Sequence, residues 1–134
     1  MADTKKKKKK VEEEADEPDA AATAVATARY VRCSARKMRL VADQVRGKKV
    51  VDARTVLNFS TRNAAQVVSK VIGSAVANAE NNHDMNSDEL FVNSIYVNEG
   101  PTMKRIRPRA MGRAFRVRKR SCHVTVELAS RKEG

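Results

Sequence analysis

The sequence has few aromatic residues: its 134 residues include no Trp, two Tyr and three Phe, an aromatic content of 4%. Domains that capture unpaired nucleobases usually stack them on exposed aromatic rings. The composition therefore disfavours a base-stacking sheet. It leaves open the recognition of a polymer through its backbone and shape.

Cysteines are also few, and Cys33 and Cys122 lie far apart with no paired CxxC spacing. The sequence has no apolar signal stretch at its N-terminus and no run of 18 or more apolar residues. These absences predict free thiols in a protein of the reducing cytosol that neither is secreted nor spans a membrane. The residues alone still permit a disulfide between the two cysteines.

Signatures of catalysis and metal binding are missing too. His83 falls in a polar stretch and His123 on an expected strand, and neither has a second ligand at metal-binding spacing. Cys122 and His123 are adjacent, so in a strand they would point to opposite faces. No glycine-rich phosphate loop, nucleophile elbow or pair of acids occurs. We expect no enzyme activity, no cofactor and no metal.

Positive charge is what the sequence has in excess. It contains 28 Lys and Arg against 16 Asp and Glu, for a net charge of +12 and a pI near 10.2. This imbalance implies a polyanionic partner. The apolar content of 41% suffices for the modest core of one domain.

Residues 1–26 differ from the rest, with a hexalysine run, Lys5 to Lys10, before an acidic cluster in residues 12–19. Blocks of like charge with low hydrophobicity predict a disordered tail. The tail has six Lys against seven acids, so the other 108 residues carry 22 basic and 9 acidic residues, or +13. The basicity therefore belongs to the domain of residues 27–134. A hexalysine that binds phosphate or serves as a localisation signal is the alternative to a self-neutralising tail.

Three helices are expected after a short extended lead, Ala28 to Cys33. Ser34 is a plausible N-cap for a helix through Arg46, which Gly47 would end. A second helix should run from Lys49 to Leu57. The strongest periodicity, over residues 63–81 behind a Ser60/Thr61 cap, predicts a core helix. The first helix keeps its cations on the outer side: Arg36, Lys37, Arg39 and Arg46.

Beyond a polar loop, Asn81 to Asp88, the pattern changes to short apolar runs and period two. Leu90 to Val97 and His123 to Leu128 are predicted strands. The sequence thus predicts an α+β domain: three helices packed on a small antiparallel sheet, with a long protruding basic β-hairpin at residues 98–122 and a disordered N-terminal tail.

The hairpin prediction rests on Pro101 to Arg120, twenty residues with nine Lys or Arg and no acid. A turn near Ala110 to Gly112 would give each leg about 12 residues, or ~40 Å at ~3.3 Å per residue. The radius of gyration of such a domain is only ~13 Å, so the hairpin would stand clear of it. An exposed hairpin without a core is marginally stable, which suggests that an enclosing polyanion orders it. A flexible basic loop without a partner is the alternative.

Three ordered motifs in residues 28–130 resemble a known family: Ser34 to Val50 (SARKMRLVADQVRGKKV), Ala75 to Asn82 (AVANAENN) and Val97 to Ala114 (VNEGPTMKRIRPRAMGRA). They resemble the bacterial form of ribosomal protein L-twenty-two of the large subunit. The resemblance implies a domain near the peptide exit that binds large-subunit (23S) rRNA and supports early assembly. It also implies that the hairpin lines the nascent-polypeptide exit tunnel, near the region where macrolides sit.

Carried over to this chain, the resemblance and the charge pattern give two sets of residues. The expected rRNA-binding cations are Arg29, Arg32, Arg36, Lys37, Arg39, Lys48, Lys49, Lys104, Arg105, Arg107, Arg109, Arg113, Arg116, Arg118, Lys119 and Arg120. The expected tunnel-lining residues are Met103, Lys104, Arg105, Ile106, Arg107, Pro108, Arg109, Ala110, Met111, Gly112 and Arg113.

The expected partners are large-subunit rRNA, neighbouring large-subunit proteins and the nascent peptide, in cytoplasmic ribosomes, with no membrane and no homo-oligomer. A DNA-architectural protein with a groove-binding β-ribbon is the main alternative. Such an arm normally has an apolar wedge at its tip, where this sequence offers only Met111. An RNA-modifying enzyme is a weaker alternative, because no cofactor signature occurs.

Overall fold

The computed structural model describes residues 22–130 of the protein. Its main sheet has three antiparallel strands in the order β1-β5-β2. The strands are β1 (Thr23–Val31), β2 (Leu90–Glu99) and β5 (Cys122–Ser130). The central strand is β5, in which Val126 pairs with Ala26 on one side and with Ile95 on the other.

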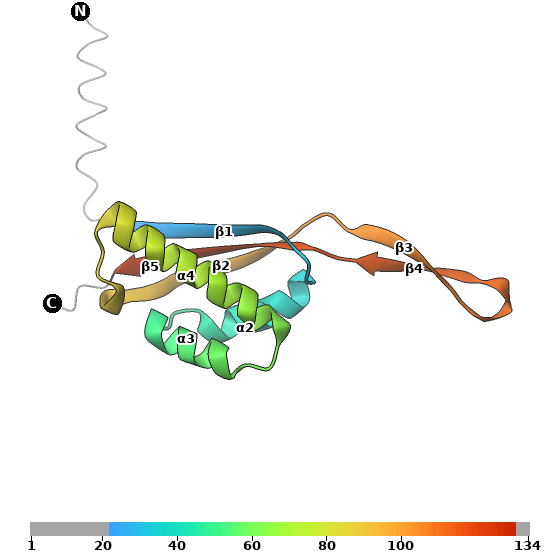
Figure 1. The fold of residues 1–134 in the computed structure, drawn as a ribbon, viewed down its shortest axis with the longest axis horizontal. Coiled ribbons are helices and arrows are strands. Elements are labelled where there is room, and N and C mark those ends of the chain that lie inside the picture. The colour runs from blue at the N-terminus through green and yellow to red at the C-terminus, as the bar shows by residue number, and fades with distance from the viewer. Residues whose placement is uncertain (1–21, 131–134) are drawn as a thin grey trace, which may run out of the picture.

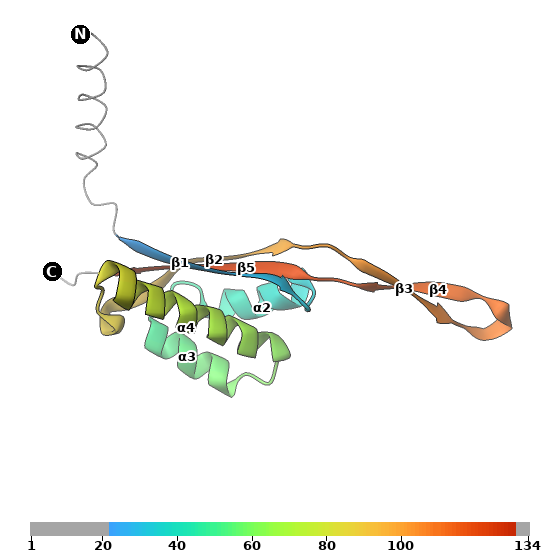
Figure 2. The ribbon, with the colours of Figure 1, turned by 45° about the horizontal axis from the view of Figure 1, so that its top comes forward.

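Three helices cover one face of this sheet, as Figures 1 and 2 show. They are α2 (Ala35–Val45), α3 (Val50–Phe59) and α4 (Asn63–His83). The Ser34 side chain accepts a hydrogen bond from the Lys37 backbone N–H, and Gly47 adopts a positive φ of 78° after α2. The predicted α+β class, with three helices on an antiparallel sheet, is confirmed.

The core lies between the helices and the sheet. Met38 of α2, Ile72 of α4 and Leu128 of β5 are among its largest fully buried side chains. Small residues fill the space between α4 and β1, where Ala24, Ala26 and Ala75 are all buried. Because small side chains allow close approach, α4 can pack directly over the edge of the sheet.

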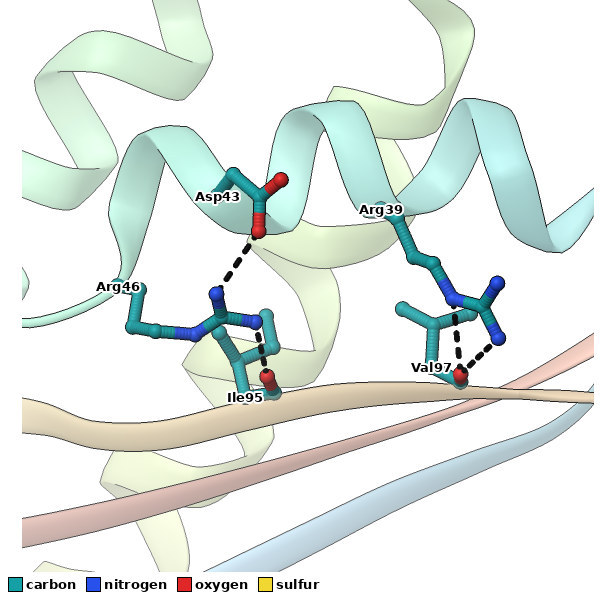
Figure 3. A network of polar contacts seen from close by, with 5 residues as sticks. All are labelled: Arg39, Asp43, Arg46, Ile95 and Val97. Carbon is teal, nitrogen blue, oxygen red and sulfur yellow. Dashed lines mark hydrogen bonds and ion pairs between the residues drawn. The ribbon is translucent and has the colours of Figure 1, made fainter.

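The outer edge of β2 is covered rather than left open. The Gly47 N–H donates to the Val92 carbonyl at 3.0 Å, and the Val92 N–H donates to the Lys48 carbonyl at 2.9 Å. Further along, Arg39 donates to the Val97 carbonyl at 3.1 Å and Arg46 donates to the Ile95 carbonyl at 2.8 Å (Figure 3). These contacts satisfy carbonyl groups that an edge strand would otherwise expose.

The domain begins earlier in the chain than the sequence suggested. Residues 23–26 were assigned to the tail, but they start β1, because Ala24 and Ala26 alternate into the core and pair with β5. Residues 1–21, with the hexalysine run and the acidic cluster, lie outside the described residues.

Two boundaries of α4 also differ from the prediction. Its N-cap is Arg62, with no side-chain cap bond, and not Ser60 or Thr61. The helix continues to His83 where a loop was predicted from Asn81, and Asp84 ends it in a left-handed conformation. The Met85 N–H then donates back to the Ala79 carbonyl at 3.1 Å, which satisfies a terminal carbonyl of the helix.

Candidate nucleic-acid interface

A two-stranded hairpin projects from the end of the main sheet, away from the three helices (Figures 1 and 2). Its strands are β3 (Met103–Pro108) and β4 (Ala114–Lys119), which pair only with each other. Every residue of β3 is exposed, and Val117 is the one residue of β4 that is partly covered. The hairpin therefore has no core of its own.

The register of the hairpin places cations beside apolar residues. On one face Arg105 lies opposite Val117 and Arg107 lies opposite Phe115. Directly opposed residues share a face of the sheet, so the alkyl stems of these arginines can pack on apolar neighbours while their guanidinium groups remain in solvent. On the other face Lys104 lies opposite Arg118. Like charges in that position repel each other, and a bound anion would relieve the repulsion.

The tip of the hairpin is a short turn, η2 (Ala110–Gly112). Gly112 has a φ of 69°, and Met111 shares the left-handed region with a φ of 62°. The Arg109 N–H donates to the Arg113 carbonyl at 2.7 Å and closes the turn. The Met111 side chain is 93% exposed, so it is available for contact with a partner.

The root of the hairpin is closely packed. The Gly100 N–H donates to the Ser121 carbonyl at 2.9 Å, and the Ser121 hydroxyl donates to the Pro101 carbonyl. A Cβ on Gly100 would lie 2.9 Å from the Ser121 Oγ and 3.3 Å from the His123 ring. The two legs can therefore meet this closely only because residue 100 has no side chain.

The predicted rRNA-binding cations outside the hairpin are all exposed, and the side chains of Arg32 and Arg39 also make contacts within the protein. The exposed cations are Arg29, Arg32, Arg36, Lys37, Arg39, Lys48 and Lys49. Arg39 differs in its contacts, because its guanidinium donates to the Val97 carbonyl and holds α2 against β2 (Figure 3). Arg32 donates to the Lys119 and Arg120 carbonyls at 3.3 and 3.2 Å, so it joins the end of β1 to the hairpin.

Sequence reasoning did not select Arg62 as a binding residue. The fold places it beside a cleft of about 860 Å³ that is also lined by Arg32, Lys37, Arg118 and Arg120. Among residues 22–130, no acidic residue lines this cleft. The local sequence carried no signal for this grouping, because Arg62 lies 56 residues before Arg118 in the chain.

Metal ligands, membrane-spanning helices and reactive thiols in the described residues 22–130 would each indicate a different function. No group of three or more His, Cys, Asp or Glu residues there could hold a metal ion. In the same range, no helix is long and apolar enough to cross a membrane. Cys33 and Cys122 are free thiols. Burial and, secondarily, the nearby Cys33 raise the pKa of the Cys122 thiol, which favours its protonated, unreactive form.

Known proteins resemble this chain over nearly all of its described residues. The family described as "Ribosomal protein L22p/L17e" matches residues 26–129. The "Large ribosomal subunit protein uL22" of Desulfitobacterium hafniense (strain DSM 10664 / DCB-2) is 58% identical over 111 residues, covering 83% of this chain and 97% of that protein. A protein of the same name from Pediococcus pentosaceus is 52% identical over 112 residues, covering 84% of this chain and 95% of that protein.

Proposed function

Because the chain belongs to the ribosomal protein L22p/L17e family, in which its relatives are named as proteins of the large ribosomal subunit, we propose that it acts there by binding 23S rRNA. It is a structural constituent of the ribosome. Its binding supports early assembly of the subunit, and its hairpin lines the nascent-polypeptide exit tunnel. Its other partners are neighbouring ribosomal proteins and the nascent peptide, in cytoplasmic ribosomes, and it acts without forming a homo-oligomer.

The observation that carries rRNA binding is the exposed, acid-free hairpin. Residues 101–120 contain nine Lys or Arg and no acid, and no core packs against β3 or β4. Arginine suits a phosphate partner because its planar fork donates two hydrogen bonds and its charge does not titrate. A polyanion that encloses the hairpin would offset the repulsion between cations such as Lys104 and Arg118.

The shape of the molecule supports the tunnel role. The hairpin stands away from the helices, so its tip can reach a site that the domain itself does not approach (Figure 1). The tip exposes Met111 together with Arg109 and Arg113, which suits a surface that meets both rRNA and passing peptide. The tunnel-lining segment is residues 103–113.

The first test compares rRNA affinity at several salt concentrations. Replacing Arg107, Arg109 and Arg113 with Ala should weaken binding to 23S rRNA. It should also reduce the slope of log affinity against log salt by roughly 2 to 3, because each lost phosphate contact removes ~0.7 to 0.9. The helical circular dichroism signal should not change, since these side chains lie outside the core.

The control for this test removes cations that lie outside the hairpin. Arg54 and Lys70 are exposed residues of α3 and α4. The Arg54→Ala/Lys70→Ala variant should retain most of the salt slope. Equal slopes for the wild-type protein and the hairpin variant would exclude the proposed role of the hairpin.

A second experiment tests the DNA-architectural alternative. Sedimentation of the wild-type chain with the nucleoid rather than with ribosomal particles at high salt would favour that alternative.

A further inference from the structure

Five cations from four parts of the chain surround the cleft at the root of the hairpin. Arg32 directly follows β1, Lys37 lies in α2 and Arg62 is the N-cap of α4. Arg118 lies in β4, and Arg120 directly follows that strand. The volume of about 860 Å³ lies within the range of sites that enclose organic ligands. Bringing five like charges together costs free energy, and an anion bound in the cleft would offset that cost.

Two helices add to the positive potential of the cleft. Both α2 and α4 begin beside it, and neither has an acidic residue in its first turn. The N-cap of α4, Arg62, makes no side-chain cap bond. The Ala65 N–H donates to the Arg62 carbonyl at 3.1 Å. This leaves the Asn63 and Ala64 N–H groups at the start of this 21-residue helix available to an acceptor.

One of the cations is fixed in place before any ligand binds. Arg32 donates to the Lys119 and Arg120 carbonyls at 3.3 and 3.2 Å, which ties the end of β1 to the exit of the hairpin. Those carbonyls orient its guanidinium beside Arg118 and Arg120. The cleft is thus built jointly by the domain and the hairpin.

We propose that this cleft binds the phosphate backbone of rRNA at the root of the hairpin, with Arg62 and Lys37 closing on the phosphates from the helical side. This inference rests on the proposed function and adds a binding site to it. The cleft shares Arg118 with β4, so one strand of rRNA can contact both the hairpin and the cleft through this residue. Phosphate bound here fixes the direction in which the hairpin leaves the domain, because both parts hold the same strand.

The test uses the full-length variant Lys37→Gln/Arg62→Gln. Both side chains are exposed, and neither makes a contact that holds the fold, so the variant should keep the circular dichroism spectrum and unfolding midpoint of the wild type. Its slope of log affinity against log salt for 23S rRNA should fall by ~1.4 to 1.8, the value for two lost phosphates. The Arg54→Gln/Lys70→Gln control removes the same charge from positions outside the cleft and should lose much less. The charge-preserving Lys37→Arg/Arg62→Lys variant should keep the wild-type slope.

Two failures can be told apart. If the wild-type protein binds 23S rRNA no better than it binds duplex DNA, the proposed function fails and the cleft proposal fails with it. If the wild type binds rRNA and the hairpin variant is weakened, but the cleft variant has the same slope and affinity as its control, only the cleft proposal is overturned. That second result would leave an acidic protein segment as the occupant of the cleft.

Discussion

At the scale of single residues, exposed cations of the same type have different roles. Arg39 lies on the same helix as Arg36, and Arg46 follows the last residue of that helix, but the guanidinium groups of Arg39 and Arg46 donate to backbone carbonyls of β2 (Figure 3). Arg46 also contacts the Asp43 carboxylate at 2.8 Å, which forms an ion pair on the surface. Arg36 has no such contact, so its guanidinium can serve a partner. Exposure and charge alone do not distinguish these roles.

The Arg46→Ala variant should therefore lose stability rather than rRNA binding. We expect the free energy of unfolding to fall by about 1 kcal/mol, because a charge-assisted hydrogen bond to the Ile95 carbonyl is lost from a half-exposed position. Arg36→Ala removes the same charge from α2 and should leave stability unchanged. Urea unfolding measures both, and equal stability losses in the two variants would contradict the role of Arg46.

At the scale of elements, the long helix α4 contributes many buried residues to the core, but it contains a glycine, which is a poor helix former. Gly73 lies in its interior and is partly exposed. A Cβ there would meet only the end of the Arg54 side chain, at 3.8 Å. This open space shows that packing does not require a glycine at this position.

Replacing Gly73 with Ala should stabilise the protein. A glycine inside a helix costs roughly 0.5 to 1 kcal/mol relative to alanine, and the added methyl group makes an ordinary contact. The urea midpoint should rise. Gly100→Ala should have the opposite effect, since its Cβ would lie 2.9 Å from the Ser121 Oγ. A lower midpoint for Gly73→Ala would mean that α4 is strained at this point.

At the scale of the whole molecule, the domain and the hairpin differ in what stabilises them. The domain has a continuous core from β1 through β5, whereas β3 and β4 expose nearly all of their side chains. Ile106 is 76% exposed and Phe115 is 55% exposed. The hydrogen bonds of a hairpin without a core open readily in water, so its order should depend on a partner that surrounds it.

Hydrogen exchange in the purified protein should show this difference. Amides of residues 103–119 should exchange rapidly, while amides of residues 124–128 in the central strand should be protected by close to the full free energy of unfolding. Addition of 23S rRNA should slow exchange in the hairpin. Strong protection of the hairpin without RNA would contradict the view that a polyanion orders it.

The sequence by itself determined the features that depend on local spacing. The recurrence of apolar residues along α4, the Ser34 cap, the Gly47 stop and the acid-free segment between two apolar strands each follow from neighbouring residues. These patterns sufficed for the α+β class and for the hairpin with its turn at Ala110 to Gly112. Helical periodicity and turn chemistry act over a few residues, so they can be read without the fold.

Only the tertiary structure decided which distant residues meet. Thr23 to Ala26 become a strand because β5 offers them hydrogen bonds, although their own composition resembles the tail. Arg39 and Arg46 turn toward β2 because its outer edge has carbonyls without strand partners. Arg62 joins Arg32 and Arg120 because α4 begins beside the hairpin root. These contacts join residues that are far apart in the chain, so local sequence patterns do not predict them. They form only when the chain packs in three dimensions.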